Sequence, residues 1–355
     1  MSRSRRPSPS GEGCYLVTGA TGMIGGEICS LLLSEGRPVL AAVNASSLAE
    51  ARSRLNTRLR LSRPAARPAG RAPEILLGDI RRPDWGAGLA RPAGIIHCAA
   101  NTSFTDEEGC WSTNVGGMES VLRLAKRFRD APRILHLSTA SVVTAPTNST
   151  LREEEAFAGF RNAYTRSKRE AERRLRASGL AAVILRPSIV LSRGIQDRAM
   201  ARSILWSLWA VVRLGQAPLR PSSRLDIVPV DYVAAAAVRL ALARKPRERC
   251  YHVSAGPESS RSVAELLERA SEVFPLASHV AFQSRSSKGN AARRPSRLER
   301  ALAHYLPFIN ANLVYSSERL RAEFGFPACA PATSYVPDLL RLIDPREALS
   351  ESLAP

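Results

Sequence analysis

Residues 14–36, CYLVTGATGMIGGEICSLLLSEG, combine an apolar run, a glycine-rich turn and a helical repeat in immediate succession. The apolar run from Tyr15 to Thr18 has the length of a buried strand. Apolar residues then recur with a helical period between positions 24 and 32, and Gly36 marks the end of that helix. A strand, a tight turn and a helix in this order predict the first unit of a parallel α/β sheet.

The glycines of this turn follow the spacing GxxGxxG. The first glycine permits a tight turn, the second lets a diphosphate approach the backbone, and the third allows close packing of helix and strand. The amides at the helix N-terminus then face the phosphates. The turn therefore predicts dinucleotide binding, with these candidate contacts: Gly19, Thr21, Gly22, Met23, Ile24 and Gly25.

Strand and helix patterns alternate through the first half of the chain. Short apolar runs predict further strands at 38–43, 74–79, 94–100, 133–139 and 181–188. Amphipathic patterns between the strands predict helices, notably over 114–129 and 162–178. This alternation predicts the α/β class and a Rossmann-type, doubly wound parallel sheet covered by helices on both faces.

The regular alternation of strand and helix patterns ends after about residue 190. We expect a strand and an Ala-rich helix over 226–243, a strand at 250–256, a helix over 262–274 capped by Ser262, a mobile loop at 283–297, and helices around 302–306, 316–324 and 336–342. The expected parts are a disordered basic tail (1–12), a dinucleotide-binding Rossmann domain (13–190, with 226–256 returning to it), a smaller C-terminal substrate-binding lobe over the strand ends (191–225 and 257–345), and a second tail (346–355).

Charge and cysteine content narrow the class of protein. The formal net charge is +19, but the arginines are dispersed and accompany no nucleic-acid-binding motif, so we predict no nucleic-acid partner. The six cysteines form no CxxC pair and no cluster with histidine, which predicts reduced thiols in a cytoplasmic protein and no metal site. The first ten residues, MSRSRRPSPS, lack the apolar core of a secretion signal. Residues 203–214 are apolar but fall short of the roughly 18 residues that a membrane span needs.

The end of the second predicted strand bears on the choice between NAD and NADP. An acid there binds the ribose hydroxyl of NAD, whereas a nearby arginine accommodates the phosphate of NADP. Here the strand ends at Asn44, with no acid, and Arg52 and Arg54 follow. We therefore expect NADP(H), with NAD(H) as the alternative, and Asn44 and Arg54 as contacts. Asp79 either meets the adenine edge or caps the turn after its strand.

The stretch NAYTRSKREAE, residues 162–172, contains one of only four lysines in the chain. Tyr164 and Lys168 are four residues apart on a predicted helix, so both side chains lie on one face. An adjacent ammonium favours the phenolate and should lower the pKa of Tyr164 toward the range of a general acid/base. A third member is expected at the end of the strand over 133–139, where Thr139 is our first choice. Ser138 and Ser141 are the fallbacks, and a hydroxyl that only satisfies the turn is the structural alternative.

Together these motifs resemble the extended short-chain dehydrogenase/reductase family over about residues 13–340. The motifs are TGATGMIG, GDI, IIHCAA, the Asn114-Val115 pair, STASVV, YTRSK and RPS. The resemblance implies that Thr139, Tyr164 and Lys168 are catalytic. It also implies that the cofactor is lined by Ile80, Ala99, Ala100, Asn114, Tyr164, Lys168 and Pro187.

Within that family, the chain is most similar to thioester reductase domains and to fatty acyl-CoA reductases of the male-sterility type. The likeness lies in LAEARSRL (48–55), LLGDIRRPDWG, HCAANTSF, NVGGMESVLRLA and DIVPVDYVAAA. It implies reduction of a CoA- or carrier-bound acyl thioester to an aldehyde or alcohol. Where those relatives have an arginine at the end of the second strand, this chain has Asn44. We expect any acyl carrier to act in trans, and an acidic acyl carrier protein would suit the basic chain.

Two other classes of function are compatible with the sequence. A nucleotide-sugar epimerase or dehydratase, or a hydroxysteroid-type dehydrogenase, would share the fold and the catalytic residues. An NADP-binding sensor or a nucleic-acid-associated protein would keep the fold without turnover, but the complete set of Thr139, Tyr164 and Lys168 argues against it. The apolar stretch 203–214, with Trp206 and Trp209, could line an acyl groove or touch a membrane surface, or belong to the core.

Overall fold

A computed structural model gives the fold of the chain. It describes residues 13–62, 72–143, 145, 148–154, 162–192, 204–217, 219–273, 280–282, 296–303 and 305–341. The predictions for the two tails and for most of the loop at 283–297 concern residues outside these ranges.

A seven-stranded sheet forms the centre of the dinucleotide-binding part. Its strand order is β12-β7-β5-β4-β1-β2-β3. The strands are β1 (Tyr15–Thr18), β2 (Val39–Val43), β3 (Glu74–Leu77), β4 (Gly94–His97), β5 (Arg133–Leu137), β7 (Ala182–Pro187) and β12 (Cys250–Val253). The pairings from β3 to β7 are all parallel. The amides of Ile184 and Ser188 bond to the carbonyls of Arg249 and Val253, so β12 runs parallel as well. The predicted strands and the parallel sheet are confirmed.

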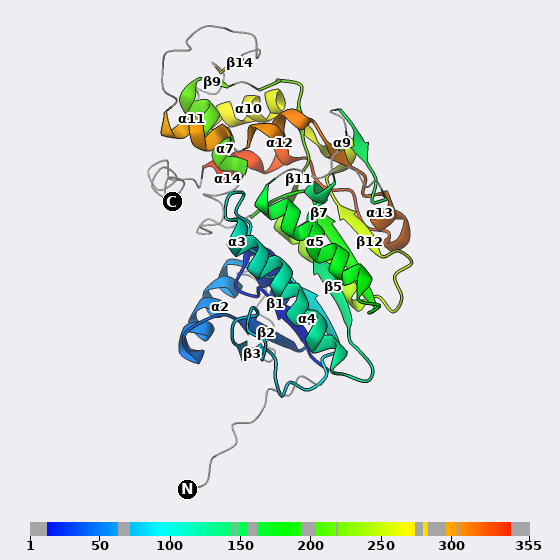
Figure 1. The fold of residues 1–355 in the computed structure, drawn as a ribbon. Helices are drawn as coiled ribbons and strands as arrows, with labels where there is room; N and C mark the ends of the chain where they lie inside the picture. The colour runs from blue at the N-terminus through cyan, green and yellow to red at the C-terminus, as the bar shows by residue number, and fades with distance from the viewer. Residues whose placement is uncertain are drawn as a thin grey trace. The chain divides into compact units, whose positions relative to one another are not determined.

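Helices connect these strands, and the connections proceed from the middle of the sheet toward its two opposite edges (Figure 1). The connections through α1 (Met23–Ser34) and α2 (Leu48–Ser62) lead from β1 to β3, and those through α4 (Gly117–Lys126) and α5 (Ala163–Ala177) lead from β4 to β7. Right-handed crossovers therefore place the two helix pairs on opposite faces of the sheet. The order reverses between β1 and β4, and ligands bind at the carboxyl ends of the strands at such a switch point.

Alternate residues of the strands pack against α4 and α5. Leu16, Ile95, Ile134 and Ile184 come from four neighbouring strands and are at most 2% exposed. They share one core cluster with residues of α4 and α5, including the fully buried Met118. Because side chains alternate along a strand, the later residues of the same parity, nearer the carboxyl ends, also face α5. That register brings polar residues of the sheet beneath the helix that contains Tyr164.

The chain divides into two compact units. The first consists of Met1–Val142, Gly159–Arg186 and Val233–Tyr251, and the second of Val143–Ala158, Pro187–Tyr232 and His252–Pro355. The predicted domain limits differ from this division and stay a prediction. The remaining helices of the first unit are α3 (Glu107–Cys110), a π-helical turn (Trp111–Gly116), a 3₁₀ turn (Ala140–Val142) and most of α8 (Val230–Leu242).

The second unit has a helical core and several two-stranded pairs. Its helices are α7 (Ile204–Leu214), α9 (Gly256–Ser259), α10 (Val263–Ser271), α11 (Arg297–Ala303), α12 (Leu306–Ala311), α13 (Glu318–Phe324), a 3₁₀ turn (Ala332–Ser334) and α14 (Val336–Leu340). Its strand pairs are β6 (Thr150–Leu151) with β15 (Val314–Tyr315), β8 (Ile189–Leu191) with β11 (Ile227–Pro229), β9 (Gln216–Ala217) with β14 (Ala281–Phe282), and β10 (Arg224–Leu225) with β13 (Arg261–Ser262). Ser262 caps α10 through a reciprocal capping box with Glu265, as predicted for that helix start.

Of the two tryptophans in the apolar stretch 203–214, Trp209 belongs to the core of the second unit. It is 4% exposed and packs in a cluster with residues of α10 and α14. For this residue the core interpretation is therefore correct, and a membrane-facing role is not. Ser203 and the side chain of Trp206 lie outside the described part of the structure.

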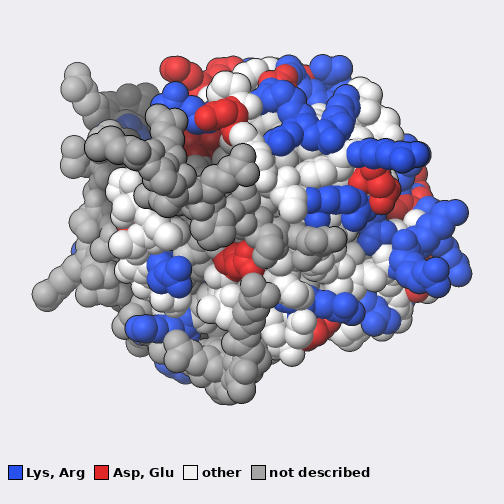
Figure 2. All heavy atoms as spheres, turned by 90° about the horizontal axis from the view of Figure 1, so that it is seen from below, with Lys and Arg blue, Asp and Glu red and all other residues white. Residues whose placement is uncertain are grey.

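Basic side chains are distributed over the surface in several groups. Figure 2 shows these groups on one face with acidic side chains between them, in keeping with the dispersed arginines of the sequence. All six cysteines are free thiols. Within the described ranges, no helix combines the length and the apolar character that a membrane crossing requires.

Candidate functional site

The glycine turn after β1 can be formed only by glycines at two of its positions. Gly19 has a φ of +67°, and a Cβ atom there would lie 2.7 Å from the Ala99 backbone nitrogen. A Cβ atom on Gly25 would lie 2.2 Å from the Gly19 carbonyl oxygen. The Gly22 amide donates to that same oxygen at 2.9 Å and closes the turn. Side chains at these positions would displace backbone, so the close approach predicted from the spacing is present.

The N-terminus of α1 is open for an anion. Gly22 is its N-cap residue and makes no side-chain capping bond. Among the described residues, no N-cap side chain accepts from the first amides of this 12-residue helix, as in a diphosphate site at a helix N-terminus. Gly22 is exposed, and Thr21, Met23 and Ile24 are partly exposed. These features fit a dinucleotide diphosphate.

Arg58 of α2 reaches over the glycine turn, which the sequence did not indicate. Its Nε donates to the Thr21 carbonyl oxygen at 3.3 Å. A Cβ atom on Gly26 would lie 2.2 Å from the Arg58 Cγ, so the fourth glycine leaves room for this side chain. A guanidinium thus lies beside the predicted diphosphate site.

Thr18 joins the ends of β1 and β4. Its Oγ1 accepts from the amides of Cys98 and Ala99, both at 3.2 Å, and lies 2.8 Å from the His97 Nδ1. These bonds hold the HCAA segment against the glycine turn, where Gly19 meets Ala99. Ala99 and Ala100 are both partly exposed. Their predicted place beside the cofactor is consistent with this arrangement.

Opposite charges meet at the end of β2. The Arg54 Nη1 donates to the Asn44 carbonyl oxygen at 2.7 Å, and half of the arginine side chain is exposed. Glu50 lies 3.6 Å from Arg54 and accepts from the amide and the hydroxyl of Ser46, at 2.8 and 2.6 Å. The Ser46 bonds lower the pKa of Glu50, so this carboxyl is ionised. The strand end itself has no acid, but the fold brings Glu50 from α2 to within reach of it.

Asp79 caps the turn that follows β3. Its Oδ1 accepts from the Arg81 amide at 2.9 Å, and both carboxylate oxygens bond the Arg81 guanidinium. These bonds lower the pKa of Asp79. Ile80 packs near Gly117 at the start of α4. The turn-capping alternative is therefore observed, and contact of Asp79 or Ile80 with an adenine ring stays a prediction.

The three predicted catalytic side chains come together at the carboxyl end of β5. Tyr164 is hydrogen-bonded to the side chain of Thr139. Lys168, one turn further along α5, donates from Nζ to the Leu137 carbonyl oxygen. Of the fallback hydroxyls, Ser138 donates to Glu172 instead, and Ser141 uses its amide to bond the Thr139 oxygen at 3.2 Å. Thr139 is thus the hydroxyl beside the phenol.

The pKa of Tyr164 is shifted in the direction opposite to the prediction. Burial raises the pKa of Tyr164 to about 12, although the Thr139 hydrogen bond favours the phenolate. Lys168 is 1% exposed, and burial lowers its pKa to about 8, although Cys98 and Glu172 favour its charged form. The prediction that Lys168 lowers the pKa of Tyr164 was wrong: lost hydration raises this pKa, and the opposing contribution comes from Thr139 and not from Lys168. A phenol that keeps its proton is suited to donate it.

Asn114 lies in the π-helical turn before α4 and ties three segments together. Its Oδ1 accepts from the Asn101 amide at 2.8 Å, and its Nδ2 donates to the Asn101 carbonyl at 2.9 Å and to the Ser167 Oγ at 2.8 Å. Ser167 in turn donates to the Tyr164 carbonyl at 2.9 Å. Asn162 caps α5 by accepting from the Thr165 amide. Asn114 is thus linked to α5, the helix of Tyr164 and Lys168, and π turns are frequent at functional sites.

Pro187, the last cofactor residue predicted, is the buried final residue of β7. It begins a segment of the second unit, whereas the other predicted site residues belong to the first. Its contact with a nicotinamide stays a prediction. Among the described residues, no group of three or more His, Cys, Asp or Glu side chains is arranged to hold a metal ion.

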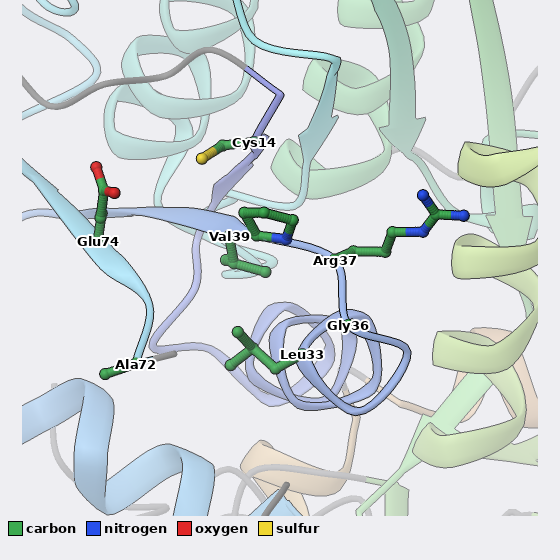
Figure 3. A pocket seen from close by; sticks show the side chains of 8 residues that line it. Cys14, Leu33, Gly36, Arg37, Val39, Ala72 and Glu74 are labelled. Carbon is green, nitrogen blue, oxygen red and sulfur yellow. The ribbon is translucent and has the colours of Figure 1, made fainter. Parts of the chain in front are cut away.

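A hollow of about 210 Å³ lies at the amino ends of the strands, where β2 begins. Figure 3 shows Leu33 of α1 and Val39 of β2 in its wall, with the Arg37 guanidinium extending away from them. It adjoins the amino ends of the strands, not the carboxyl ends where ligands bind in this architecture. This hollow is therefore separate from the candidate cofactor site.

The parallel sheet and the glycine turn are those of an NAD(P)-dependent extended short-chain dehydrogenase/reductase. A family described as Male sterility protein matches residues 17–237, which is more than half of the chain. The chain therefore belongs to the male sterility protein family of NAD-binding domains.

Relatives in known proteins include much larger enzymes. The chain is 30% identical over 251 residues to an isonitrile lipopeptide synthase of Streptomyces coeruleorubidus, covering 65% of this chain and 17% of the relative. It is 26% identical over 264 residues to a nonribosomal peptide synthetase of Aspergillus flavus, covering 66% and 25%. It is also 29% identical over 232 residues to a 3 beta-hydroxysteroid dehydrogenase/Delta 5-->4-isomerase of Mycobacterium tuberculosis, covering 60% and 56%. The chain thus spans less than two thirds of each of these relatives.

Solved structures show the same fold. A thiolation-reductase di-domain from an archaeal non-ribosomal peptide synthetase has a TM-score of 0.72 at 19% identity, covering 96% of this chain and 76% of that one. The terminal R domain from the myxalamid PKS-NRPS pathway has a TM-score of 0.69 at 22% identity, covering 96% and 91%. UDP-glucuronic acid 4-epimerase from Bacillus cereus, in complex with NAD, has a TM-score of 0.66 at 14% identity, covering 92% and 96%.

Proposed function

We propose that this chain reduces an acyl thioester, bound to CoA or to a carrier protein, to an aldehyde or an alcohol. The observation that carries the proposal is the meeting of Thr139, Tyr164 and Lys168 at the carboxyl ends of the parallel strands, the same side of the sheet as a glycine turn that fits a dinucleotide. Similarity to synthetases and to reductase domains in their assembly lines favours a thioester over other carbonyl substrates. We further propose a Rossmann domain over 13–190 and 226–256 and a substrate lobe over 191–225 and 257–345.

The side chains of the site suit the reduction of a carbonyl. A bound nicotinamide supplies the hydride. Thr139 and Tyr164 would hold the oxygen of the thioester carbonyl as negative charge develops on it, and Tyr164 would supply the proton that completes a hemithioacetal. The hemithioacetal would then release the CoA or carrier thiol, with its hydroxyl proton passing to the sulfur, to leave the aldehyde, and a second hydride would be needed for the alcohol. The raised pKa of Tyr164 keeps that proton in place until it is needed. Lys168 would hold the cofactor ribose and contribute a positive charge below its pKa of about 8.

The test is turnover by the purified chain. It is incubated with NADPH or NADH and a panel of acyl-CoA and carrier-bound thioesters, while cofactor absorbance and aldehyde or alcohol products are followed. We expect at least one thioester to consume reduced cofactor in proportion to product. Absence of cofactor oxidation with every thioester, at protein concentrations that bind the cofactor, would sink the proposal.

A second candidate is a hydroxysteroid-type dehydrogenase or a nucleotide-sugar epimerase or dehydratase. The 29% identity with a steroid dehydrogenase and the shared fold with an epimerase favour it. An epimerase leaves no net change in the cofactor because it recycles it within one turnover. A sugar nucleotide converted without net cofactor oxidation, or a hydroxysteroid oxidised with NAD, would therefore identify this candidate.

We propose NADPH as the preferred reductant, with NADH as the alternative. Arg54 is half exposed at the end of β2 and could turn its guanidinium to a ribose phosphate. Glu50 is the competing group, because its carboxylate could accept from the ribose hydroxyl of NAD. Its bonds to Ser46 and its proximity to Arg54 already engage that carboxylate.

Replacing Arg54 with alanine should reduce the preference for NADPH over NADH by about tenfold or more, since charge-assisted hydrogen bonds contribute about 1.5–3 kcal/mol. The ratio of kcat/KM values for the two cofactors is the measurement. The matched control is Arg52→Ala on the same helix, for which we expect an unchanged ratio. An Arg54→Ala enzyme with the wild-type ratio would contradict the assignment.

We also propose that a carrier-bound substrate is delivered by an acidic acyl carrier protein acting in trans. The net charge of +19 would attract such a partner, and salt would screen the attraction. We expect kcat/KM for a carrier-bound thioester to fall as ionic strength rises, and to fall less for the same acyl group on a short pantetheine analogue. Equal salt dependence for the two substrates would argue against electrostatic docking.

A further inference from the structure

Helix α5 binds the end of β5 at three successive residues. Thr139 is hydrogen-bonded to Tyr164, the Leu137 carbonyl accepts from Lys168, and the Ser138 hydroxyl donates to Glu172 at 2.5 Å. The three helix residues are spaced four apart, so they lie along one face of α5. The first two contacts belong to the predicted catalytic residues. The third is made by a glutamate to which the mechanism assigns no role.

Glu172 is the centre of a buried polar cluster. It is 1% exposed, and it accepts from the Arg186 Nε at 2.9 Å and from the Arg186 Nη2 at 2.6 Å. Arg176, one turn later and half exposed, adds a third cationic contact at 2.9 Å. Burial favours the neutral acid, but the arginines and Ser138 outweigh it and hold the pKa of Glu172 below its ordinary value. The carboxylate is therefore charged where hydration is lost.

The position of this carboxylate connects three elements of the first unit. Arg186 ends the part of β7 that belongs to the unit, Ser138 and Thr139 directly follow the neighbouring strand β5, and Glu172 follows Lys168 by one helical turn. A buried ion pair contributes little net stability compared with an apolar pair of the same size. Its geometric role is stronger, because both carboxylate oxygens and a short hydroxyl bond fix the helix against two strands.

We propose that Glu172 is a positioning residue for hydride transfer: it fixes the register of α5 on β5 so that Thr139, Tyr164 and Lys168 converge, and it supplies the charge opposite the Lys168 ammonium. The role rests on the proposed reductase activity. Glu172 itself touches neither substrate nor cofactor in this assignment. It acts through Ser138 on the strand and through Lys168 on the helix.

The charge of Glu172 also bears on Lys168. The ionisable groups that act on Lys168 or are acted on by it are Cys98, His97, His136 and Glu172. Burial lowers the pKa of His97 to about 3 and that of His136 well below its ordinary value, so both imidazoles are neutral. Burial raises the pKa of the Cys98 thiol to about 12, so it too is uncharged near neutral pH. Glu172 is the one carboxylate in this set and favours the charged form of Lys168, so removing its charge should lower the pKa of Lys168.

The first test replaces Glu172 with glutamine, which keeps the shape and an oxygen for Ser138 but removes the charge. We expect kcat/KM for thioester reduction to fall by about 10- to 100-fold, the scale of a small misplacement of catalytic groups. The alkaline limb of the pH profile should move to lower pH, because Lys168 loses its proton earlier. The matched control is Glu170→Gln on the same helix, where the carboxylate pairs with Arg173 and Arg174 nearer the surface. It should leave both rate and pH profile unchanged.

Two further measurements separate positioning from stability and from the choice of substrate. Glu172→Asp keeps the charge, so its pH profile should stay near that of the wild type even if its melting temperature falls. NADPH binding followed by cofactor fluorescence across pH reports on Lys168 without any thioester. We expect Glu172→Gln to lose NADPH affinity at lower pH than the wild type, whatever the substrate is. Glu170→Gln and Glu172→Asp should keep the wild-type pH dependence of NADPH binding. If Glu172→Gln keeps it as well, or if the activity of the variants follows their melting temperature alone, the positioning role is overturned. A wild-type enzyme that reduces no thioester would overturn the proposed function instead.

Discussion

Replacing Tyr164 with phenylalanine is expected to lower kcat by about 10²- to 10⁴-fold, the range that a positioned proton donor contributes. The substitution removes only the hydroxyl, and the ring keeps its packing at the start of α5. The lost group is the one hydrogen-bonded to Thr139, and its raised pKa means that it holds a proton to give. Single-turnover reduction of the best thioester, at saturating cofactor, measures the chemical step directly.

The control for this variant is a phenol elsewhere in the chain. Tyr232 donates its hydroxyl to the Pro327 carbonyl at 2.7 Å, and burial raises its pKa strongly. Tyr232→Phe should cost stability of about 1 kcal/mol, typical of one lost hydrogen bond, and leave kcat near the wild-type value. NADPH affinity should be similar in both variants and the wild type. If Tyr164→Phe kept more than about a tenth of the wild-type kcat, well above the expected range, Tyr164 would not be the proton donor.

The second large effect concerns the glycine turn: Gly19→Ala is expected to weaken NADPH binding by about 100-fold or more, as displacements of about 1 Å at a binding or catalytic geometry do. Gly19 combines a positive φ with a Cβ position that overlaps the backbone of Ala99. Backbone atoms cannot rotate away as a side chain can, so the turn itself must shift. The shift would move the first amides of α1 away from the diphosphate. Fluorescence titration with NADPH gives the dissociation constant.

Gly36→Ala is the matched control for the backbone penalty. Gly36 follows α1 with a φ of +70°, close to that of Gly19, but a Cβ atom there meets nothing within 4 Å. Both variants should lose roughly 1–3 kcal/mol of stability through the strained φ, whereas only Gly19→Ala should lose cofactor affinity. Equal affinities in the two variants would show that the turn does not cradle the diphosphate.

The fold was predictable because each strand is a short apolar run bounded by a turn. The first strand, Tyr15–Thr18, has the predicted bounds, and Ser262 starts its helix with a full capping box. The π-helical turn at Trp111–Gly116 was not predictable. A single wide turn leaves the apolar spacing of the surrounding helix almost unchanged, so its signal disappears in the helical period.

The candidate site was predictable where spacing along one element decides geometry. The helical period alone predicts that Tyr164 and Lys168 lie on one face of their helix. The same period would have placed Glu172, eight residues after the tyrosine, on that face. Groups that meet through packing were missed: Arg58 over the glycine turn, and Glu50 at the end of β2. The direction of the pKa shift of Tyr164 depends on how far neighbouring helices and strands exclude water from the phenol. A local sequence pattern does not contain this information.

The first unit is assembled from three separated stretches of chain, and one arginine shows what this means for dissection of the protein. Arg133, at the start of β5, donates to carbonyls at the end of α8, including those of Ala241 and Arg244 at 2.8 and 3.1 Å. More than a hundred residues separate the two partners. A fragment cut after the last predicted catalytic residue, Lys168, would leave this guanidinium without those acceptors, and the sheet would lose β7 and β12. Hybrid proteins should therefore be made by exchanging the segments Val143–Ala158 and Pro187–Tyr232, which interrupt the first unit. Excising an N-terminal half would divide that unit.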